Sequence, residues 1–141
     1  MSETRREVIY MDKVVHFEIP VDDLARAKKF YSSIFNWEIV DWPMPGGIIY
    51  TGVRTVPVDE KTFVPKEPGA INGGMTQRSK EVPAPIITVS VSSIDEYVNK
   101  VEAAGGKAVT PKAEVPGMGF YAYVADSEGN VIGLWEDLKK A

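Results

Sequence analysis

The pattern of apolar and polar positions changes its period within residues 14–35. In the first part of this stretch Val15, Phe17 and Ile19 alternate with polar residues. Alternation with period two is typical of a β-strand that has one face in the core. Apolar residues then recur at helical spacing behind an aspartate that can cap a helix. These residues are Leu24, Ala27, Phe30, Tyr31 and Ile34, and the cap is Asp22 or Asp23.

The polar side of the first strand carries His16 and Glu18. If the helix packs on the apolar side, these two residues point toward the other face of the sheet. An imidazole beside a carboxylate is the strongest indication of chemistry in the chain, because histidine titrates near neutral pH and a carboxylate can orient it. The alternative is a histidine that hydrogen-bonds Glu18 or a tyrosine and only fills space.

The remaining elements follow from the same periodicities and from the turn residues between them. Further strands are predicted over residues 36–42, 48–53, 70–77, 85–91, 107–110, 120–124 and 130–137. A second helix is predicted from Ser92 or Ser93 to about residue 104, where Gly105 and Gly106 end it. Residues 1–13 are expected to form an N-terminal tail, and residues 54–69 a long loop.

The second half of the chain repeats the first. Val21 matches Val91 at an offset of 91 − 21 = 70, and Gly69 matches Gly129 at 129 − 69 = 60. The repeat predicts an α+β fold with two tandem βαβββ modules, over residues 14–77 and 84–138, joined by a linker at 78–83 into a single domain, 14–138. Each module has only one helix, so one face of its strands stays uncovered. We expect the two sheets to face each other as a cupped, partly open, antiparallel-rich surface with the helices outside.

Composition narrows the function further. The net charge of −4 argues against a nucleic-acid surface, and the absence of cysteine excludes thiolate nucleophiles and cysteine–zinc sites. The 141 residues contain no apolar run long enough to cross a membrane and no apolar signal segment near Met1. We therefore expect a cytoplasmic protein with no membrane and no nucleic-acid partner.

Four segments resemble the vicinal oxygen chelate superfamily, which includes glyoxalase I, extradiol dioxygenases and bleomycin-resistance proteins. They read VHFEIPVDDLARAKKFYSSIFNWE, INGGM, KVEAAGGKAV and DSEGNVIGLWE, and they span residues 14–136. The resemblance is strongest to small uncharacterised glyoxalase-like proteins related to lactoylglutathione lyase. It implies paired βαβββ modules, a site in the cup, frequently a divalent metal, and a homodimer.

The metal of the family can be checked position by position. The ligand positions on the first and fourth strands of the two modules fall on His16, Ile86, Gly73 and Gly133. Only His16 is a ligand type, and a divalent ion needs three or four convergent donors. We therefore predict no cofactor and no metal ligands. A divalent metal held by His16 and Glu18, with ligands from water or a second subunit, remains an alternative.

The predicted catalytic residues are His16, as the base, and Glu18, as its orienting partner. The predicted ligand-binding residues are Trp37, Tyr50, Asn72, Gly73, Met75, Ile86, Phe120, Tyr121, Gly133 and Trp135. The aromatic residues and the methionine could instead fill the core, and the glycines could instead allow tight strand packing.

Two classes of function fit this pattern. The first is an enzyme that acts on a small molecule without a metal, a lyase or isomerase that abstracts a proton beside a carbonyl. The second is a non-catalytic protein that binds a drug or metabolite, as bleomycin-resistance proteins do. Whether the protein is an enzyme stays open at this point.

Overall fold

The computed structural model describes residues 11–138, so most of the predicted N-terminal tail lies outside the described residues. The first module comprises β1 (Val14–Val21), α1 (Leu24–Phe35), β2 (Glu38–Pro43), a short 3-10 turn η1 (Pro45–Gly47), β3 (Ile49–Arg54) and β4 (Gly73–Gln77). The second comprises β5 (Ile86–Ser90), α2 (Ile94–Ala103), β6 (Lys107–Val115), β7 (Gly119–Ala125) and β8 (Val131–Asp137).

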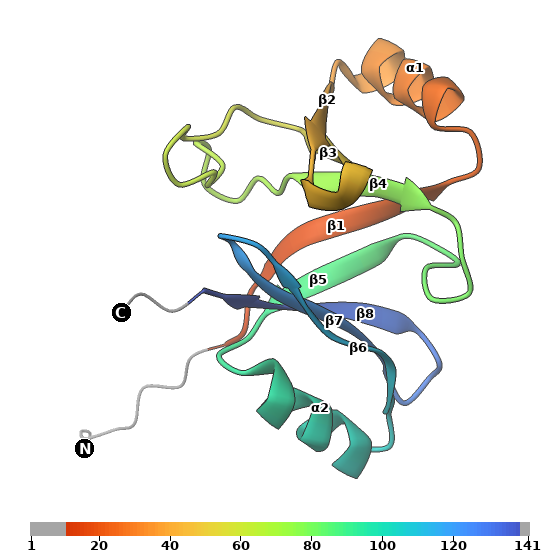
Figure 1. Cartoon of the computed structure of the whole chain (residues 1–141), viewed down its shortest axis with the longest axis vertical. Helices are drawn as coiled ribbons and strands as arrows, with labels where there is room; N and C mark the ends of the chain where they lie inside the picture. Colours follow the sequence, from red (N-terminus) through yellow and green to blue (C-terminus); the bar gives the residue numbers. More distant parts are fainter. Residues whose placement is uncertain (1–10, 139–141) are drawn as a thin grey trace.

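All eight strands form one sheet in the order β2-β3-β4-β1-β5-β8-β7-β6. The pairs β1–β4 and β5–β8 are parallel, and the other neighbouring pairs are antiparallel. The predicted α+β fold with two βαβββ modules is confirmed. The predicted cupped, partly open sheet is confirmed as well. β1 and β5 pair with each other and join the modules edge to edge, so the two sheets expected to face each other are the halves of one sheet (Figure 1).

Both helices begin at the predicted caps. The Asp23 carboxylate accepts a hydrogen bond from the backbone N–H of Arg26, and the Ser93 hydroxyl accepts one from that of Glu96. These side chains satisfy N–H groups that have no partner within the helix. Figure 1 shows the helices at opposite ends of the molecule, each beside the strands of its own module.

Each helix closes a separate core on the outer face of the sheet. Under α1, the buried residues Val21, Val53 and Met75 pack with Phe17, Ile19, Leu24, Ala27, Tyr31, Trp37 and Ile39. Under α2, the buried residues Val91, Ile94, Ala122, Val124 and Leu134 pack with Val89, Tyr97, Val98, Val101, Phe120 and Ile132. The opposite face of the sheet carries no helix formed by residues 11–138, and we call it the cup.

Two strands have an end that lies three or more residues from the prediction. β4 begins at Gly73 rather than at residue 70, because the Asn72 side chain bonds the backbone of the long loop. β6 extends to Val115 although Pro111 lies within it, and it can do so because it is the edge strand of the sheet. No helix between residues 11 and 138 has the length and apolar character of a membrane span.

Candidate functional site

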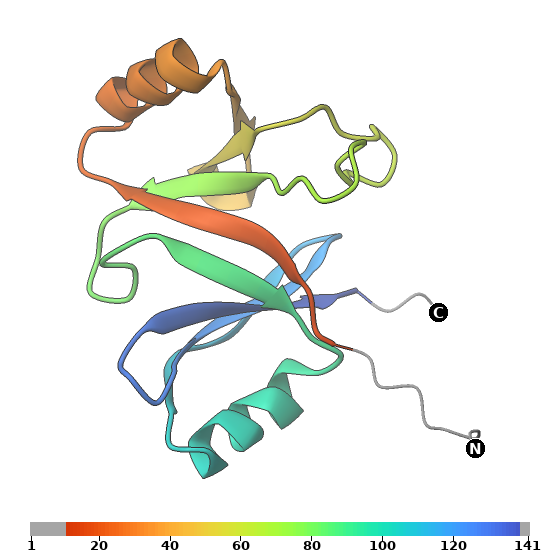
Figure 2. The ribbon, with the colours of Figure 1, turned by 180° about the vertical axis from the view of Figure 1, so that it is seen from behind.

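The first strand presents two different faces, as its alternation predicts. Phe17 and Ile19 pack in the core under α1. His16 and Glu18 therefore point into the cup, where side chains from other strands meet them. In Figure 2, β1 and β5 run side by side through the middle of the sheet, so this pair of residues lies close to the junction of the modules.

Glu18 is bound by a tyrosine of the other module. The Tyr123 hydroxyl lies 2.6 Å from both carboxylate oxygens and donates to them. β7 is three strands away from β1, a distance of roughly 14 Å in a flat sheet. The contact therefore depends on the curvature of the sheet. Burial raises the pKa of Glu18, and the hydrogen bond from Tyr123 opposes this rise.

His16 has a different partner. Its Nε2 lies 3.3 Å from the hydroxyl of Tyr50 on β3. Burial lowers the pKa of His16 from 6.5 to about 4, so the imidazole is neutral at pH 7. Over residues 11–138 no hydrogen bond joins His16 to Glu18. The predicted arrangement, in which Glu18 orients His16, is thus not what the structure shows.

The two tyrosine hydroxyls around Glu18 stay protonated. Burial and the charge of Glu18 raise the pKa of Tyr50, and burial and the hydrogen bond to Glu18 raise the pKa of Tyr123. Both hydroxyls are therefore hydrogen-bond donors over the ordinary pH range. Together with the neutral His16 imidazole, they place groups that can donate a hydrogen bond near the Glu18 carboxylate.

Glycines on the cup face let aromatic rings lie close to the backbone. A Cβ at Gly74 would stand 2.6 Å from the Tyr50 hydroxyl, and one at Gly52 would stand 3.3 Å from Nε1 of Trp42. In the second module a Cβ at Gly119 would meet the Trp135 ring at 2.7 Å. Such separations are closer than packed carbon atoms allow, so larger residues at these positions would displace the rings.

The predicted open space above Gly73 and Gly133 is not found. Gly73 faces the α1 core, where a Cβ would meet the Phe17 ring at 2.5 Å. The glycine of β4 that faces the cup is Gly74, which is the cross-strand partner of Glu18. In the second module, Gly133 is the cross-strand partner of Thr88 in the same way. The offset between the fourth strands is thus 133 − 74 = 59, and the predicted offset of 60 is wrong. At Gly133 the space is filled by the Thr88 hydroxyl, 2.5 Å from where a Cβ would stand.

Several other residues predicted to line the cup lie elsewhere. Trp37, Met75 and Phe120 pack in the helix-side cores, so their predicted place in the cup is wrong. The Asn72 carboxamide accepts bonds from the N–H groups of Thr55 and Val56 and donates to the Val56 carbonyl. It therefore holds the start of the loop rather than serving as a donor on the floor of the cup.

Besides Tyr50 and Gly133, three of the predicted ligand-binding residues lie on the cup face. Ile86 is the cross-strand partner of Glu18 and is buried. Tyr121 and Trp135 are partners of each other, and the Tyr121 ring meets the Tyr123 ring edge to face at 5.8 Å. Cross-strand partners share a face, so these side chains extend the surface that begins at Glu18.

Sequence reasoning missed Tyr123 and Trp42. Tyr123 follows Tyr121 by two residues on the same strand, so period-two alternation could have identified it. Trp42 lies on β2, where it contacts the Phe63 ring edge to face at 6.3 Å. Phe63 belongs to the loop over residues 54–69, so this loop reaches the rim of the cup.

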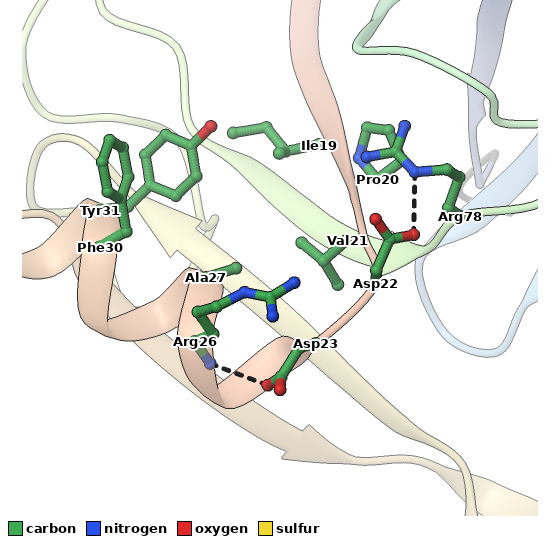
Figure 3. Close-up of a pocket in the computed structure, with 10 residues that line it drawn as sticks. All are labelled: Ile19, Pro20, Val21, Asp22, Asp23, Arg26, Ala27, Phe30, Tyr31 and Arg78. Atoms are coloured by element: carbon green, nitrogen blue, oxygen red, sulfur yellow. Dashed lines mark hydrogen bonds and ion pairs between the residues drawn. The ribbon is translucent and has the colours of Figure 1, made fainter.

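The structure also has a hollow of about 290 Å³ between α1 and the end of β1 (Figure 3). It lies on the outer side of the sheet, and neither His16 nor Glu18 lines it. Its two carboxylates have structural roles, since Asp23 caps α1 and Asp22 pairs with Arg78 at 3.0 Å. A second hollow, of about 340 Å³, lies between α2 and β6. Both hollows therefore lie apart from His16 and Glu18.

A model of the Glyoxalase/Bleomycin resistance protein/Dioxygenase superfamily matches residues 13–134. The chain belongs to this superfamily. It is 29% identical over 120 residues to the proteins named "Putative glyoxylase CFP32" of Mycobacterium tuberculosis and Mycobacterium bovis. The match covers 84% of this chain and 43% of each relative, so the chain spans less than half the length of these curated proteins.

Solved structures share the fold. The hypothetical protein BH1468 of Bacillus halodurans has a TM-score of 0.62 at 16% identity, over 94% of this chain and 99% of that one. A methylmalonyl-CoA epimerase of Streptomyces coelicolor has a TM-score of 0.60 at 13% identity, over 92% and 100%. At these identities the similarity shows the fold alone.

The residues present do not fit the divalent metal of the superfamily. With the corrected register, its ligand positions fall on His16, Ile86, Gly74 and Gly133, and only His16 can bind a metal. Between residues 11 and 138 no group of three or more His, Asp or Glu side chains is placed to hold an ion. Glu18 supplies one further donor, and two donors do not complete a divalent site.

Proposed function

We propose that this protein is a metal-independent enzyme that moves a proton next to a carbonyl group of a small molecule. The observation that carries the proposal is the partly buried Glu18 carboxylate, which is bound by the Tyr123 hydroxyl and has no ion-pair partner within residues 11–138. A carboxylate placed away from water without a cation costs stability, and such groups are concentrated at functional sites.

Glu18, rather than His16, is the base in this proposal. A base works best when its pKa approaches the working pH, and burial raises the pKa of Glu18 toward that range. The same effect lowers the pKa of His16 to about 4, which makes the imidazole a weak base. The neutral ring can instead donate a hydrogen bond from its N–H group.

The step can be written with its atoms balanced. Glu18 takes the proton from the carbon beside the carbonyl, and the C–H electron pair moves to form an enolate. The oxygen of the enolate accepts a hydrogen bond from the Tyr50 hydroxyl or the His16 N–H, which stabilises the developing charge. Glu18 then returns the proton to a neighbouring carbon of the enolate, which completes an isomerisation, whereas return to the same carbon from the same side restores the substrate. The presence of an epimerase among proteins of this fold supports the choice of reaction class.

Hydrogen exchange tests the proposal without knowledge of the substrate. Ketones, α-hydroxyketones and thioesters are incubated with the protein in D₂O and EDTA, and loss of the α-hydrogen signal is followed by proton NMR. We expect exchange with at least one compound class, and a loss of about 100-fold or more in Glu18→Gln. Equal exchange rates in Glu18→Gln and wild type, or activity lost in EDTA alone, would contradict the proposal.

A non-catalytic binding protein is the second candidate. The observation in its favour is the set of aromatic rings on the cup face, Trp42, Tyr121 and Trp135, which can stack on a flat ligand. It predicts that Trp135→Ala abolishes ligand binding and that Glu18→Gln changes it only slightly. The enzyme predicts loss of exchange in Glu18→Gln with binding retained.

A further inference from the structure

The charges on the cup face are unevenly placed. Glu18 lies on the central strand β1, and among residues 11–138 its only side-chain bond is to Tyr123. Asp137, at the end of β8, accepts a hydrogen bond from the indole N–H of Trp135, with 2.7 Å between Nε1 and Oδ1. Both of these acidic groups are thus bound by neutral donors.

The basic side chain of Arg54 on this face is already occupied. Arg54 lies at the end of β3, with its guanidinium carbon 5.6 Å from the centre of the Trp42 ring. Its Nη1 is 3.4 Å from Glu38 and 3.9 Å from Glu60, and its side chain is only 17% exposed. An anionic ligand would have to compete with these two carboxylates for the guanidinium.

We infer that the cup accepts an uncharged carbonyl compound with a flat apolar part, and that Glu18 excludes ligands carrying a carboxylate or phosphate near the reacting carbon. This inference rests on the proposed function and names the class of its substrate. The flat part would lie against Tyr121 and Trp135, while the carbonyl oxygen meets the Tyr50 hydroxyl.

The selectivity has an electrostatic origin. A ligand carboxylate about 5 Å from Glu18 would be repelled strongly enough to weaken binding by roughly 100-fold at the effective dielectric constant of a protein. The groups that face Glu18 offer no positive charge to offset this. They are the neutral His16 on its own strand, Tyr50 from β3, and Tyr123 with Tyr121 from β7. The adjacent strands β4 and β5 contribute Gly74 and Ile86.

Three probes of nearly equal size test the inference. They are benzamide, which is neutral, benzoate, which is an anion, and benzamidinium, which is a cation. Dissociation constants are measured at pH 7.5 by NMR titration with wild type, Glu18→Gln, Glu18→Ala and the control Glu102→Gln, which removes an exposed carboxylate of α2 outside the cup. The amide variant is nearly isosteric, and circular dichroism with the melting temperature checks that each variant is folded.

We expect wild type to bind benzamide at least tenfold more tightly than benzoate. Both Glu18 variants should bind the two probes equally, because the repelling charge is gone, while Glu102→Gln should keep the wild-type preference. Equal or tighter binding of benzoate by wild type would overturn the inference, as would an unchanged preference in both folded Glu18 variants. Benzamidinium binding more than tenfold tighter than benzamide would also overturn it and would identify the cup as a site for organic cations.

Lack of binding by all three probes up to about 10 mM would contradict the inference that the ligand has a flat apolar part. Even a modest ligand efficiency gives these probes a dissociation constant of about 10 mM. These measurements involve no turnover. If Glu18→Gln still exchanges α-hydrogens but the charge preference holds, only the proposed reaction fails. If exchange depends on Glu18 but benzoate binds as well as benzamide, only the substrate class fails.

Discussion

Replacing Tyr123 with phenylalanine removes one hydroxyl and leaves the Glu18 carboxylate without its donor at 2.6 Å. A hydrogen bond to a charged group contributes about 1.5–3 kcal/mol, so the free energy of unfolding at pH 8 should fall by about that amount. For a chain of this length the melting temperature should fall by roughly 5–9 °C. Urea unfolding followed by circular dichroism measures the change directly.

The loss should depend on pH. Burial raises the pKa of Glu18 above its value in the unfolded chain, so the fold loses stability as pH rises through the folded pKa. Without Tyr123 the pKa of Glu18 rises further, because the hydrogen bond lowers it. The difference in the free energy of unfolding between wild type and Tyr123→Phe should therefore be small near pH 4. It should grow above the usual pKa of 4.5 until Glu18 is ionised in both proteins.

Tyr121→Phe is the matched control, since Tyr121 lies on the same strand and face and forms no hydrogen bond to Glu18 within the described residues. In a Glu18→Gln background, Tyr123→Phe should cost clearly less than in wild type. An equal loss in the control, or a loss that does not change between pH 4 and pH 8, would refute the reasoning.

Three further predictions concern other parts of the site. Gly74→Ala should displace the Tyr50 ring and destabilise the fold by about 1–3 kcal/mol, as measured by urea unfolding. Because the pKa of His16 falls from 6.5 to about 4 on folding, this histidine should contribute a loss of up to about 3 kcal/mol as pH falls through that window, and His16→Gln should remove this contribution from the pH dependence of wild type. Asn72→Ala should speed hydrogen exchange of the Thr55 amide, with amides of the β1–β4 ladder unchanged. A pH dependence of stability that is the same in wild type and the His16 variant, or an unchanged Thr55 amide, would contradict the respective assignment.

The orientation of β1 could be predicted because the core closes on one face only. A strand buried on one side must alternate, so the apolar set of Phe17 and Ile19 placed His16 and Glu18 in the cup. The helix caps Asp23 and Ser93 could also be predicted, because few residue types have side chains that accept hydrogen bonds from the first N–H groups of a helix.

The register of β4 could not be read in the same way. Gly73 and Gly74 follow each other and have no side chains, so neither polarity nor size marks the face of each. A shift of one residue then exchanges the core and the cup positions. Likewise Met75 is apolar and suits both a helix-side core and the wall of a cup, so its residue type does not distinguish them.

The pairing of Glu18 with Tyr123 depends on the curvature of the sheet. The two residues are 105 positions apart and lie on strands separated by two others. No local pattern gives the bend that brings them together. The homodimer and the cytoplasmic location remain predictions.

A crystal structure with the tightest-binding neutral carbonyl ligand tests the central claim most directly. The account predicts the ligand in the cup, with its α-carbon next to the Glu18 carboxylate and its carbonyl oxygen about 3 Å from the Tyr50 hydroxyl. A ligand bound in the hollow beside α1, or a fully coordinated cation at His16, would contradict the account.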